Sequence, residues 1–574
     1  MFSKLNLPMW YGVLNLSEGG LTGNFIKTFM VSKKSKLRAI DFYSGIGGWS
    51  LGLKMSGIEV IASYEWWDKA NRTNHKNNLH LAAELDIRQL NLDSLPNDVD
   101  IVVGSPPCTQ FSYSNRGGNG DIEDGLKDIE KFLSIVDHVK PKWWGMENVP
   151  RVASIIAHEL QPGGRLEKFA HLTPTIKVVD MCEWGLPQRR RRCIAGNFDF
   201  DLLYAYRAHT KARTLGDVIR SMSSGVVHDP IYGISLPALK VLDHSIEEFL
   251  SEEEERMNRD MKIFHPVYNN MAFPDPLDKT ARTITATCTR VSRESIVIEA
   301  PEKKGRFRRL TVRERGCLQG FPITYQFYGD TYPQKLKMIG NAIPPLFTYY
   351  VAQAMRGITA ESVLTPEEGI QAFCPPFEPP PYSRPDSVGG SYPVNRRFRA
   401  AIPHLRFKSG VRFELANHIE EGTPSWSIKF YFGDSKNIHS LPLDLTLRRS
   451  LETNALLKPI LPKIVDAIAH IEHLISSTDA HTLQEVWTHS REHGLRPYNI
   501  VDVLGEATEK IIPVLADDLH LSKAVLDSVL QQHRSSLGFG KILKHSDAVL
   551  AGLLVSSSAN TLFRAKSFNI IRTQ

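Results

Sequence analysis

The sequence predicts an α/β protein whose first large unit is built on a parallel sheet. Between residues 37 and 200, short apolar segments alternate with helical patterns, which is the order expected of βαβ units. The chain has 574 residues, of which 42% are hydrophobic and 23% charged, so it can form several globular domains. We therefore expect a core of parallel strands early in the chain and further domains after it.

The strands and helices can be placed in chain order. Five strands are expected in the first unit, at residues 37–42, 60–64, 101–103, 143–147 and 176–179. The alternation is lost from 201 to about 305, where a charged helical stretch (245–262), a threonine-rich segment (280–289) and a strand (295–299) follow one another. We interpret 201–305 as a second or inserted domain, because compact helical sequence returns over 306–357.

A proline-rich segment that begins near Cys374 marks a linker, which we place at 358–395. Beyond it, alternating apolar residues at 411–415 and 426–432 predict a short β-hairpin, and helical patterns follow at 456–475, 500–515, 522–533 and 548–555. Residues 396–574 could be an extra DNA-binding module, an oligomerisation domain or a fused nuclease. Because no nuclease signature is found there, we expect a non-catalytic accessory domain.

Charge and cysteine content narrow the class of protein. The net charge is +6 and the pI near 8.8, which is compatible with a nucleic-acid partner. Two basic clusters, at 188–192 and 303–315, suggest phosphate contacts. Six cysteines without metal-ligand spacing predict neither a metal site nor a disulfide framework, and a reducing cytoplasm fits them. No membrane span or signal peptide is expected, residues 1–36 read as an N-terminal extension, and Met30 is an alternative start.

Cys108 is the most informative single residue. It follows the apolar strand at 101–103 on a stiff Pro106-Pro107 turn, and ligands bind at the carboxyl ends of strands in open α/β sheets. A nucleophile and a buried structural cysteine are both compatible with this motif alone. Glu147 ends another predicted strand, so the same edge would bring it into the crevice with Cys108.

A glycine-rich turn after the first strand predicts a second component of the site. Phe42, Gly45 and Gly47 lie between that strand and a helix, where backbone can approach a ligand closely. Glu65 ends the next strand and can bind ribose hydroxyls, and Trp66 can stack on adenine. Together these residues indicate an adenosine-type cofactor.

The ordered set of motifs resembles the C5-cytosine DNA methyltransferase family over residues 37–357. The matching segments are 42–48 (FxGxGG), Glu65-Trp66, Asp86-Ile87, Pro106-Pro107-Cys108, 147–149 (ENV), 188–192 (QxRxR), 313–322 (RE…QGFP) and 340–345 (GNxxPP). Thr109 and Asp180 stand where the family often has glutamine and asparagine, so the finer loop and phosphate contacts are in doubt.

The resemblance implies a Rossmann-like S-adenosylmethionine methyltransferase domain in two segments, 37–200 and 306–357, with the target-recognition domain inserted at 201–305. It implies Cys108 as the nucleophile toward cytosine C6, Glu147 as the acid at N3, Arg192 at the cytosine O2 and Arg190 as its support. Either nearby positive charge is expected to lower the pKa of Cys108, or the thiol loses its proton to solvent or phosphate during the reaction. The loop from Thr109 to Gly125 is expected to close over the flipped base.

The same resemblance implies the cofactor and DNA contacts. The residues expected to hold S-adenosylmethionine are Phe42, Gly45, Gly47, Glu65, Trp66, Asp86, Ile87, Pro107, Asn341 and Ala342. The residues expected to contact DNA are Gln188, Arg282, Thr287 and Arg290, with Thr285, Thr289 and Arg293 as further candidates.

We therefore expect a site-specific DNA cytosine-5 methyltransferase of a prokaryotic restriction–modification system. It would act as a monomer on duplex DNA in the nucleoid-associated cytoplasm, with a cognate restriction endonuclease as a further partner. One alternative is a tRNA cytosine-5 methyltransferase, which usually carries Cys-Phe-Thr where this chain has Cys317-Leu318-Gln319. A second alternative is a catalytically inactive regulator that only binds DNA or cofactor, although Cys108, Glu147 and Arg192 are all present.

Overall fold

The computed structural model describes residues 36–111, 120–223, 225–263, 271–380, 382–387, 390–407, 409–433, 437–534 and 538–570. The N-terminal extension with the alternative start at Met30 lies outside the described residues. So does the middle of the expected closing loop, residues 112–119.

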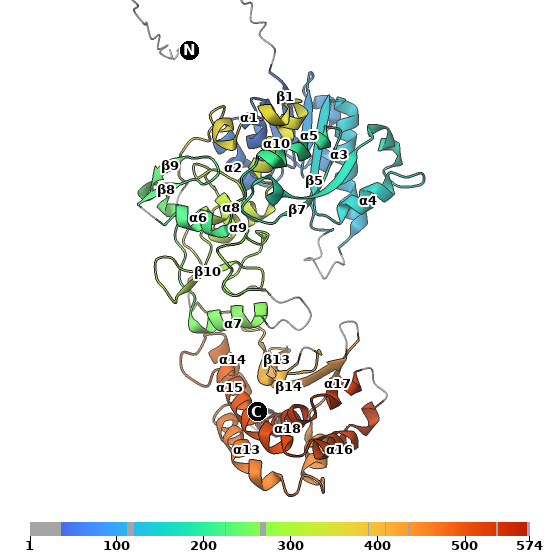
Figure 1. Cartoon of the computed structure of the whole chain (residues 1–574), viewed down its shortest axis with the longest axis vertical. Coiled ribbons are helices and arrows are strands. Elements are labelled where there is room, and N and C mark those ends of the chain that lie inside the picture. The colour runs from blue at the N-terminus through green and yellow to red at the C-terminus, as the bar shows by residue number, and fades with distance from the viewer. Residues whose placement is uncertain are drawn as a thin grey trace, which may run out of the picture.

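A seven-stranded sheet in the order β3-β2-β1-β4-β5-β7-β6 forms the centre of the first unit (Figure 1). The strands are β1 (Arg38–Phe42), β2 (Glu59–Glu65), β3 (Ala82–Glu84), β4 (Ile101–Gly104), β5 (Trp143–Asn148), β6 (Thr175–Asp180) and β7 (Arg191–Gly196). All five expected strands are present, whereas β3 and β7 were not predicted. The sheet is mixed, because β7 runs antiparallel to both β5 and β6. The expected parallel sheet is confirmed for β3, β2, β1, β4 and β5, and the pairing becomes antiparallel at β7, where a short connection from β6 favours it.

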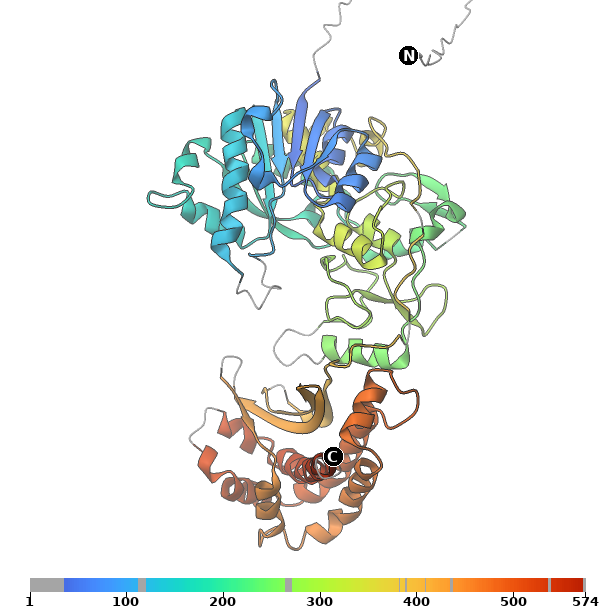
Figure 2. The ribbon, with the colours of Figure 1, turned by 180° about the vertical axis from the view of Figure 1, so that it is seen from behind.

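Helices cover both faces of this sheet (Figures 1 and 2). They are α1 (Gly48–Met55), α2 (Asp68–Asn78), α3 (Ile122–Val139), α4 (Val152–Glu159), α5 (Phe200–Ala205) and α10 (Pro345–Met355). Alternate residues of β1 enter different cores: Ala39 packs with Trp49 of α1, and Ile40 packs with Phe132 of α3. Helices α1 and α10 touch closely at Gly52, where a Cβ would lie 2.1 Å from the Thr348 hydroxyl oxygen. The chain thus returns after residue 306 to complete the first unit.

The segment between β7 and α10 has little regular structure and shares the core of the sheet. Its elements are α6 (Leu215–Ser221), β8 (Val226–His228), β9 (Ser235–Pro237), α7 (Glu252–Ile263), β10 (Val297–Glu299), β11 (Phe307–Arg309), α8 (Val312–Leu318) and α9 (Tyr332–Asn341). The helix expected at 245–262 begins only at Glu252. Ser251 and Glu254 form reciprocal backbone–side-chain hydrogen bonds of 2.9 and 3.2 Å there, which fix the helix start. We call residues 201–305 the recognition segment.

A second hydrophobic core is formed by residues between Phe398 and Phe563, and we call residues 396–570 the C-terminal unit. After α11 (Pro366–Gly369) and the linker, its elements are β12 (Arg399–Arg406), β13 (Arg412–Glu420), β14 (Thr423–Gly433), β15 (Ile438–Leu441), α12 (Leu445–Glu452), α13 (Leu461–Ser476), α14 (Ala480–Trp487), α15 (Pro497–Ala516), α16 (Leu519–Val529), α17 (Phe539–Leu543) and α18 (Ser546–Ile570). The expected hairpin is β13–β14, within a four-stranded antiparallel sheet. The four expected helices correspond to α13, α15, α16 and α18. Within the described part of the chain, no helix combines the length and apolar character that a membrane span requires.

Candidate active site

Cys108 lies in a loop that leaves the carboxyl end of β4 and is tied to its neighbours. The Asn148 amide at the end of β5 donates a hydrogen bond of 3.0 Å to the carbonyl of Pro106. The Trp49 indole donates one of 3.2 Å to the Ser105 hydroxyl, and the Phe111 amide donates to the carbonyl of Cys108 at 3.1 Å. These bonds fix the loop on both sides of the sulfur. Asn148 was expected only as part of the ENV motif, and its contact depends on how β4 and β5 pair.

The electrostatic surroundings of Cys108 differ from the sequence-based expectation. Burial raises the pKa of its thiol, and the nearby Glu147 carboxylate raises it further, while Arg192 and Arg190 act in the opposite direction. The expectation of a lowered thiol pKa is therefore wrong for this structure, because desolvation outweighs the two guanidinium groups. The sulfur is held in its protonated, weakly nucleophilic form near neutral pH.

This raised pKa predicts how Cys108 reacts with an alkylating agent. A thiol with a pKa above its ordinary value has little thiolate at pH 7 and gains it as the pH rises. We expect iodoacetamide to label Cys108 slowly at pH 7 and progressively faster toward about pH 10, as followed by mass spectrometry of the Cys108 peptide. Rapid labelling at pH 7 that does not change with pH would contradict a protonated resting thiol.

Glu147 and Arg192 form an ion pair beside this loop. The Arg192 Nε lies 2.9 Å from Glu147 Oε1, and their side chains are only 15% and 8% exposed. The contact arises because β7 lies against β5, with Glu147 opposite Ile194 in register. Since β7 was not predicted, the sequence motifs place both residues in the site but cannot show that they touch. The pair offers a carboxyl group and a guanidinium to one ligand.

Arg190 has an internal structural position. It is 1% exposed, and its guanidinium donates hydrogen bonds to the carbonyls of Ile284, Gly340 and Ala342 at 3.2, 3.1 and 2.9 Å. Burial, with a smaller contribution from Arg192, lowers the pKa of Arg190 to about 9. These bonds connect Arg190, which directly precedes β7, to the recognition segment and to the residues before α10. Arg190 therefore supports the site from the protein interior.

The glycine-rich turn and Glu65 form the second half of the site. Gly45 and Gly47 have left-handed backbone angles, φ of +50° and +84°, and the position of a Cβ at Gly45 has no atom within 4 Å. The carboxylate of Glu65 accepts the Gly45 and Trp67 amides, each at 2.9 Å, and burial raises its pKa. Trp66 is 67% exposed. Open space beside an anchored acid and an exposed aromatic ring fits an adenosine-type group, with its hydroxyls toward Glu65 and its base against Trp66.

Of the remaining residues expected to hold the cofactor, some are exposed and some are buried. Asp86 is exposed and caps a short 3-10 turn by accepting the Arg88 amide at 3.0 Å, and Ile87 behind it is buried. Pro107 and Asn341 are exposed. Phe42 is fully buried and stacks on Tyr64 at 5.1 Å, and the carbonyl of Ala342 is taken up by Arg190. Phe42 and the Ala342 carbonyl are therefore engaged in contacts inside the protein.

Asp41, a buried acid beside the glycine-rich turn, is a candidate site residue that the sequence motifs did not single out. It is fully buried at the end of β1, and burial raises its pKa to about 7. Its Oδ2 accepts the amide and hydroxyl of Ser50 at 3.1 and 2.7 Å, while Oδ1 has no hydrogen-bond partner among the described residues. No periodicity signal separates such an acid from its apolar neighbours in a buried strand.

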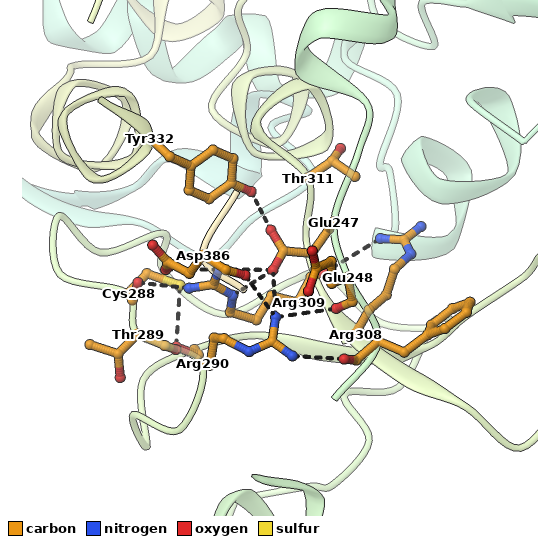
Figure 3. A network of polar contacts seen from close by, with 12 residues as sticks. Glu247, Glu248, Cys288, Thr289, Arg290, Arg308, Arg309, Thr311, Tyr332 and Asp386 are labelled. Carbon is orange, nitrogen blue, oxygen red and sulfur yellow. Dashed lines mark hydrogen bonds and ion pairs between the residues drawn. The ribbon is translucent and has the colours of Figure 1, made fainter. Parts of the chain in front are cut away.

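Two of the expected DNA contacts lie in the protein interior. Gln188 is 0% exposed, donates to the Leu318 carbonyl at 2.9 Å and accepts the Ile284 amide at 2.8 Å. Arg290 is 6% exposed and lies 2.6 Å from Glu254, in the polar network of Figure 3. The structure gives both side chains internal partners, so we do not carry them into a DNA interface.

The other candidates of the recognition segment are nearer the surface. Arg282 is partly buried and ion-paired with Asp275 at 2.7 Å, whereas Thr287 and Thr289 are exposed. The basic cluster at 303–315 is also largely internal. Arg308 pairs with Glu314, and Arg309 with Glu247, each at 2.8 Å (Figure 3). Arg313 and Arg315 are buried as well and donate to the carbonyls of Tyr325 and Thr285, so the four arginines at 308, 309, 313 and 315 have internal partners, and only Lys303, Lys304 and half-buried Arg306 remain open to phosphates.

The architecture is that of a Rossmann-like methyltransferase: a parallel-rich sheet with helices on both faces. A family model described as C-5 cytosine-specific DNA methylase matches residues 37–357, more than half of the chain. The chain therefore belongs to the C5-cytosine DNA methyltransferase family and is a DNA cytosine-5 methyltransferase.

Relatives of known class share this region. The chain is 27% identical over 353 residues to the type II methyltransferase M1.HphI of Haemophilus parahaemolyticus, which covers 58% of this chain and 89% of that protein. It is 28% identical over 338 residues to the type II methyltransferase M.HindV of Haemophilus influenzae, which covers 57% of this chain and 99% of that protein. Among solved structures, the S. pombe Dnmt2 methyltransferase covers 56% of this chain and 99% of its own, with 15% identity and a TM-score of 0.42.

Proposed function

We propose that this enzyme transfers a methyl group from S-adenosylmethionine to C5 of a cytosine in a specific duplex DNA sequence, through a covalent bond between Cys108 and C6. The observation that carries the proposal is the meeting of Cys108 with the Glu147–Arg192 ion pair at one edge of the sheet. The type II methyltransferase relatives support a role in a restriction–modification system. The enzyme would act as a monomer on DNA, beside a cognate endonuclease.

Each residue of the site has its own role in the reaction. Cys108 loses its proton and its sulfur bonds to C6, so that the electrons of the C5–C6 double bond become available at C5. Glu147 donates a proton to the ring at N3 and thereby relieves the charge that this addition creates. Arg192 holds Glu147 in place and donates to the cytosine O2. After C5 has gained the methyl group, the proton on C5 leaves to water and the sulfur–C6 bond breaks, which restores the C5–C6 double bond and the thiolate, and the proton on N3 returns to Glu147.

The raised pKa of Cys108 is consistent with these roles. An unreactive thiol in the free enzyme is protected from oxidation and alkylation, and it must be activated when substrate arrives. Because C6 is covered in a stacked duplex, the cytosine has to be flipped into the crevice, at a cost of a few kcal/mol. Exposed Thr287 and Thr289 remain candidates for reading the bases around it.

The methyl donor would be held by Glu65 at its ribose hydroxyls, by Trp66 at adenine and by the turn of Gly45 and Gly47. When bound, S-adenosylmethionine supplies an electrophilic methyl group. We expect Glu65→Gln to weaken donor binding by about 10- to 100-fold, because an amide cannot accept from two backbone amides and from hydroxyls at once. Isothermal titration calorimetry with S-adenosylhomocysteine measures this without turnover. Glu59→Gln, at the exposed start of the same strand, is the matched control, and equal affinities in both variants would contradict the assignment.

Transfer of tritiated methyl groups from S-adenosylmethionine to duplex DNA and to tRNA tests the substrate class. We expect incorporation into DNA only, with 5-methylcytosine as the sole labelled nucleoside. Cys317-Leu318-Gln319, in place of Cys-Phe-Thr, favours this outcome over tRNA. Labelling of tRNA alone would establish the RNA alternative, and binding of DNA without any transfer would establish the inactive regulator.

A further inference from the structure

The C-terminal sheet has one face packed on helices and one polar face. Along β13 and β14, apolar residues such as Phe413 and Ile428 alternate with polar ones, and the apolar set lies in the second core with α15 and α18. The register of the strands puts the opposite set on one surface, which we call the outer face. Its members are Arg399, Ala401, Arg406, Arg412, Glu414, Ala416, His418, Glu420, Ser425, Ser427, Lys429, Tyr431, Ile438 and Ser440, and Arg397 joins them through its contact with His418.

The outer face carries an excess of positive charge, with alanine and serine residues between the charged side chains. Glu414 is shared by Arg399 and Arg412, which donate to its two oxygens at 2.5 and 2.7 Å, and Lys429 lies opposite it in register. Arg397 adds a fourth cation beside His418, at 3.3 Å, and Glu420 at the hairpin tip is the second acid. With Arg406, which lies opposite Arg412 in register, the face has five cations and two carboxylates, and this excess of positive charge favours an anionic partner.

The chemistry of the face fits phosphate groups in particular. Arg399 is 52% exposed and Lys429 is exposed, so both can reach a ligand, whereas Arg412 is buried and holds Glu414. Serine hydroxyls at 425 and 427 lie next to these cations in register. Arginine, lysine and serine side chains supply most protein contacts to the DNA backbone, and such contacts need no particular base sequence.

The orientation of the face directs it toward the catalytic unit. Figures 1 and 2 show the sheet on the side of the C-terminal unit nearer to the catalytic core, with α18 beyond it. In Figure 1, β1 runs toward the C-terminal unit, so the carboxyl ends of the parallel strands face the same way. The loop with Cys108 leaves one of these ends. The outer face and the carboxyl ends of the strands are therefore both directed toward the region between the catalytic core and the C-terminal unit.

Helix α7 fixes this orientation. On one side, its Glu254 binds Arg290 of the recognition segment at 2.6 Å. On the other side, its Arg256 makes two hydrogen bonds of 2.7 Å to Asp502 of α15, and Glu253 receives Arg496 at 3.0 Å.

The linker adds to this junction. The guanidinium of Arg396 lies 3.6 Å from the ring centres of both Tyr392 and Trp487. Asp386 contacts Arg309 at 3.1 Å within the network of Figure 3. The C-terminal unit is thus attached to the recognition segment through several charged and aromatic contacts.

We infer that the outer face of the C-terminal sheet binds the phosphate backbone of the substrate duplex beside the target site. The inference rests on the proposed function, since it assigns the partner as the same DNA molecule that is methylated. The C-terminal unit then extends the footprint of the enzyme on DNA beyond the bases that are recognised, through Arg399, Lys429 and Arg397. This contact is independent of sequence and is weakened by salt.

The test compares full-length Arg399→Gln/Lys429→Gln with the wild-type enzyme on target-containing duplexes of about 12 and about 40 base pairs. We expect the wild type to bind the long duplex more tightly and with a steeper salt dependence. In the variant, binding of the long duplex should weaken about 5- to 20-fold, and the log–log salt slope should fall by about 2. Binding and methylation of the short duplex should be unchanged, which also shows that the variant folds.

Lys463→Gln/Lys510→Gln is the matched control, because it removes the same charge from exposed positions on α13 and α15. Arg397→Gln is a second, milder variant that leaves Glu414 fully paired. Equal affinity and salt slope of the wild type for both lengths would overturn the inference, as would equal losses in face and control variants. A wild-type enzyme that methylates neither duplex would instead count against the proposed function.

Discussion

Cys108→Ser is expected to reduce methyl transfer to duplex DNA by at least about 10³-fold, because a serine hydroxyl is a far weaker nucleophile toward C6 than a thiolate. The substitution is nearly isosteric, and the loop is held by Asn148 and Trp49 rather than by the sulfur. We therefore expect unchanged donor binding and an unchanged melting temperature. Single-turnover transfer of labelled methyl groups measures the effect on the chemical step.

Cys374→Ser provides the control, since Cys374 is exposed in the linker and far from the strand ends in sequence. It should retain full activity. Substantial turnover by Cys108→Ser would contradict the covalent mechanism, whereas equal losses in both variants would indicate a general sensitivity to cysteine replacement.

Glu147→Gln is expected to lower kcat by about 10²- to 10⁴-fold, which is the range for removing a general acid. Glutamine can still accept a hydrogen bond from Arg192, but it cannot donate an acidic proton to N3 of the ring. The KM for DNA should change less than kcat, because the lost interaction develops as the sulfur adds. Steady-state methylation at several DNA concentrations separates the two parameters.

Glu183→Gln is the matched control for this variant. Glu183 is also ion-paired with an arginine, Arg207, but it is exposed at the surface. Its replacement should leave kcat and KM unchanged. A Glu147→Gln enzyme whose kcat equals that of the wild type would exclude Glu147 as the acid and leave it only the role of pairing with Arg192.

The sequence was sufficient to predict five of the seven strands of the first sheet, β1, β2, β4, β5 and β6. Buried strands such as β4 are continuous apolar runs; Cys108 comes four residues after β4, and Glu65 and Glu147 lie at the carboxyl ends of β2 and β5. For this reason, their placement at one sheet edge could be predicted from strand order alone. The hairpin β13–β14 was equally visible, because its apolar residues alternate strictly.

Contacts between distant segments could not be predicted in this way. Strand β7 begins inside the arginine run at 191–192, where charge hides the apolar pattern, so the Glu147–Arg192 pair was not foreseen. Arg290 was expected at the DNA surface because it lies in the segment where the family carries its target-recognition domain. Its partner Glu254 lies 36 residues earlier in the chain, and only the folded chain brings the two together.

The raised pKa of Cys108 could not be predicted for the same reason. The basic residues near the motif suggested a lowered value, but the degree of burial decides the sign, and burial follows from packing. The short edge strands β3 and β15 were not predicted, because three or four residues are too few to show an alternating or continuous apolar pattern.

Bisulfite sequencing of DNA from cells that express the full-length chain or its Cys108→Ser variant tests the central claim most directly. The account predicts protected cytosines within one recurring sequence in cells with the wild-type chain and none above background in cells with Cys108→Ser. Unprotected cytosines throughout the DNA from cells that express soluble wild-type protein, or the same protected sequence with Cys108→Ser, would contradict it.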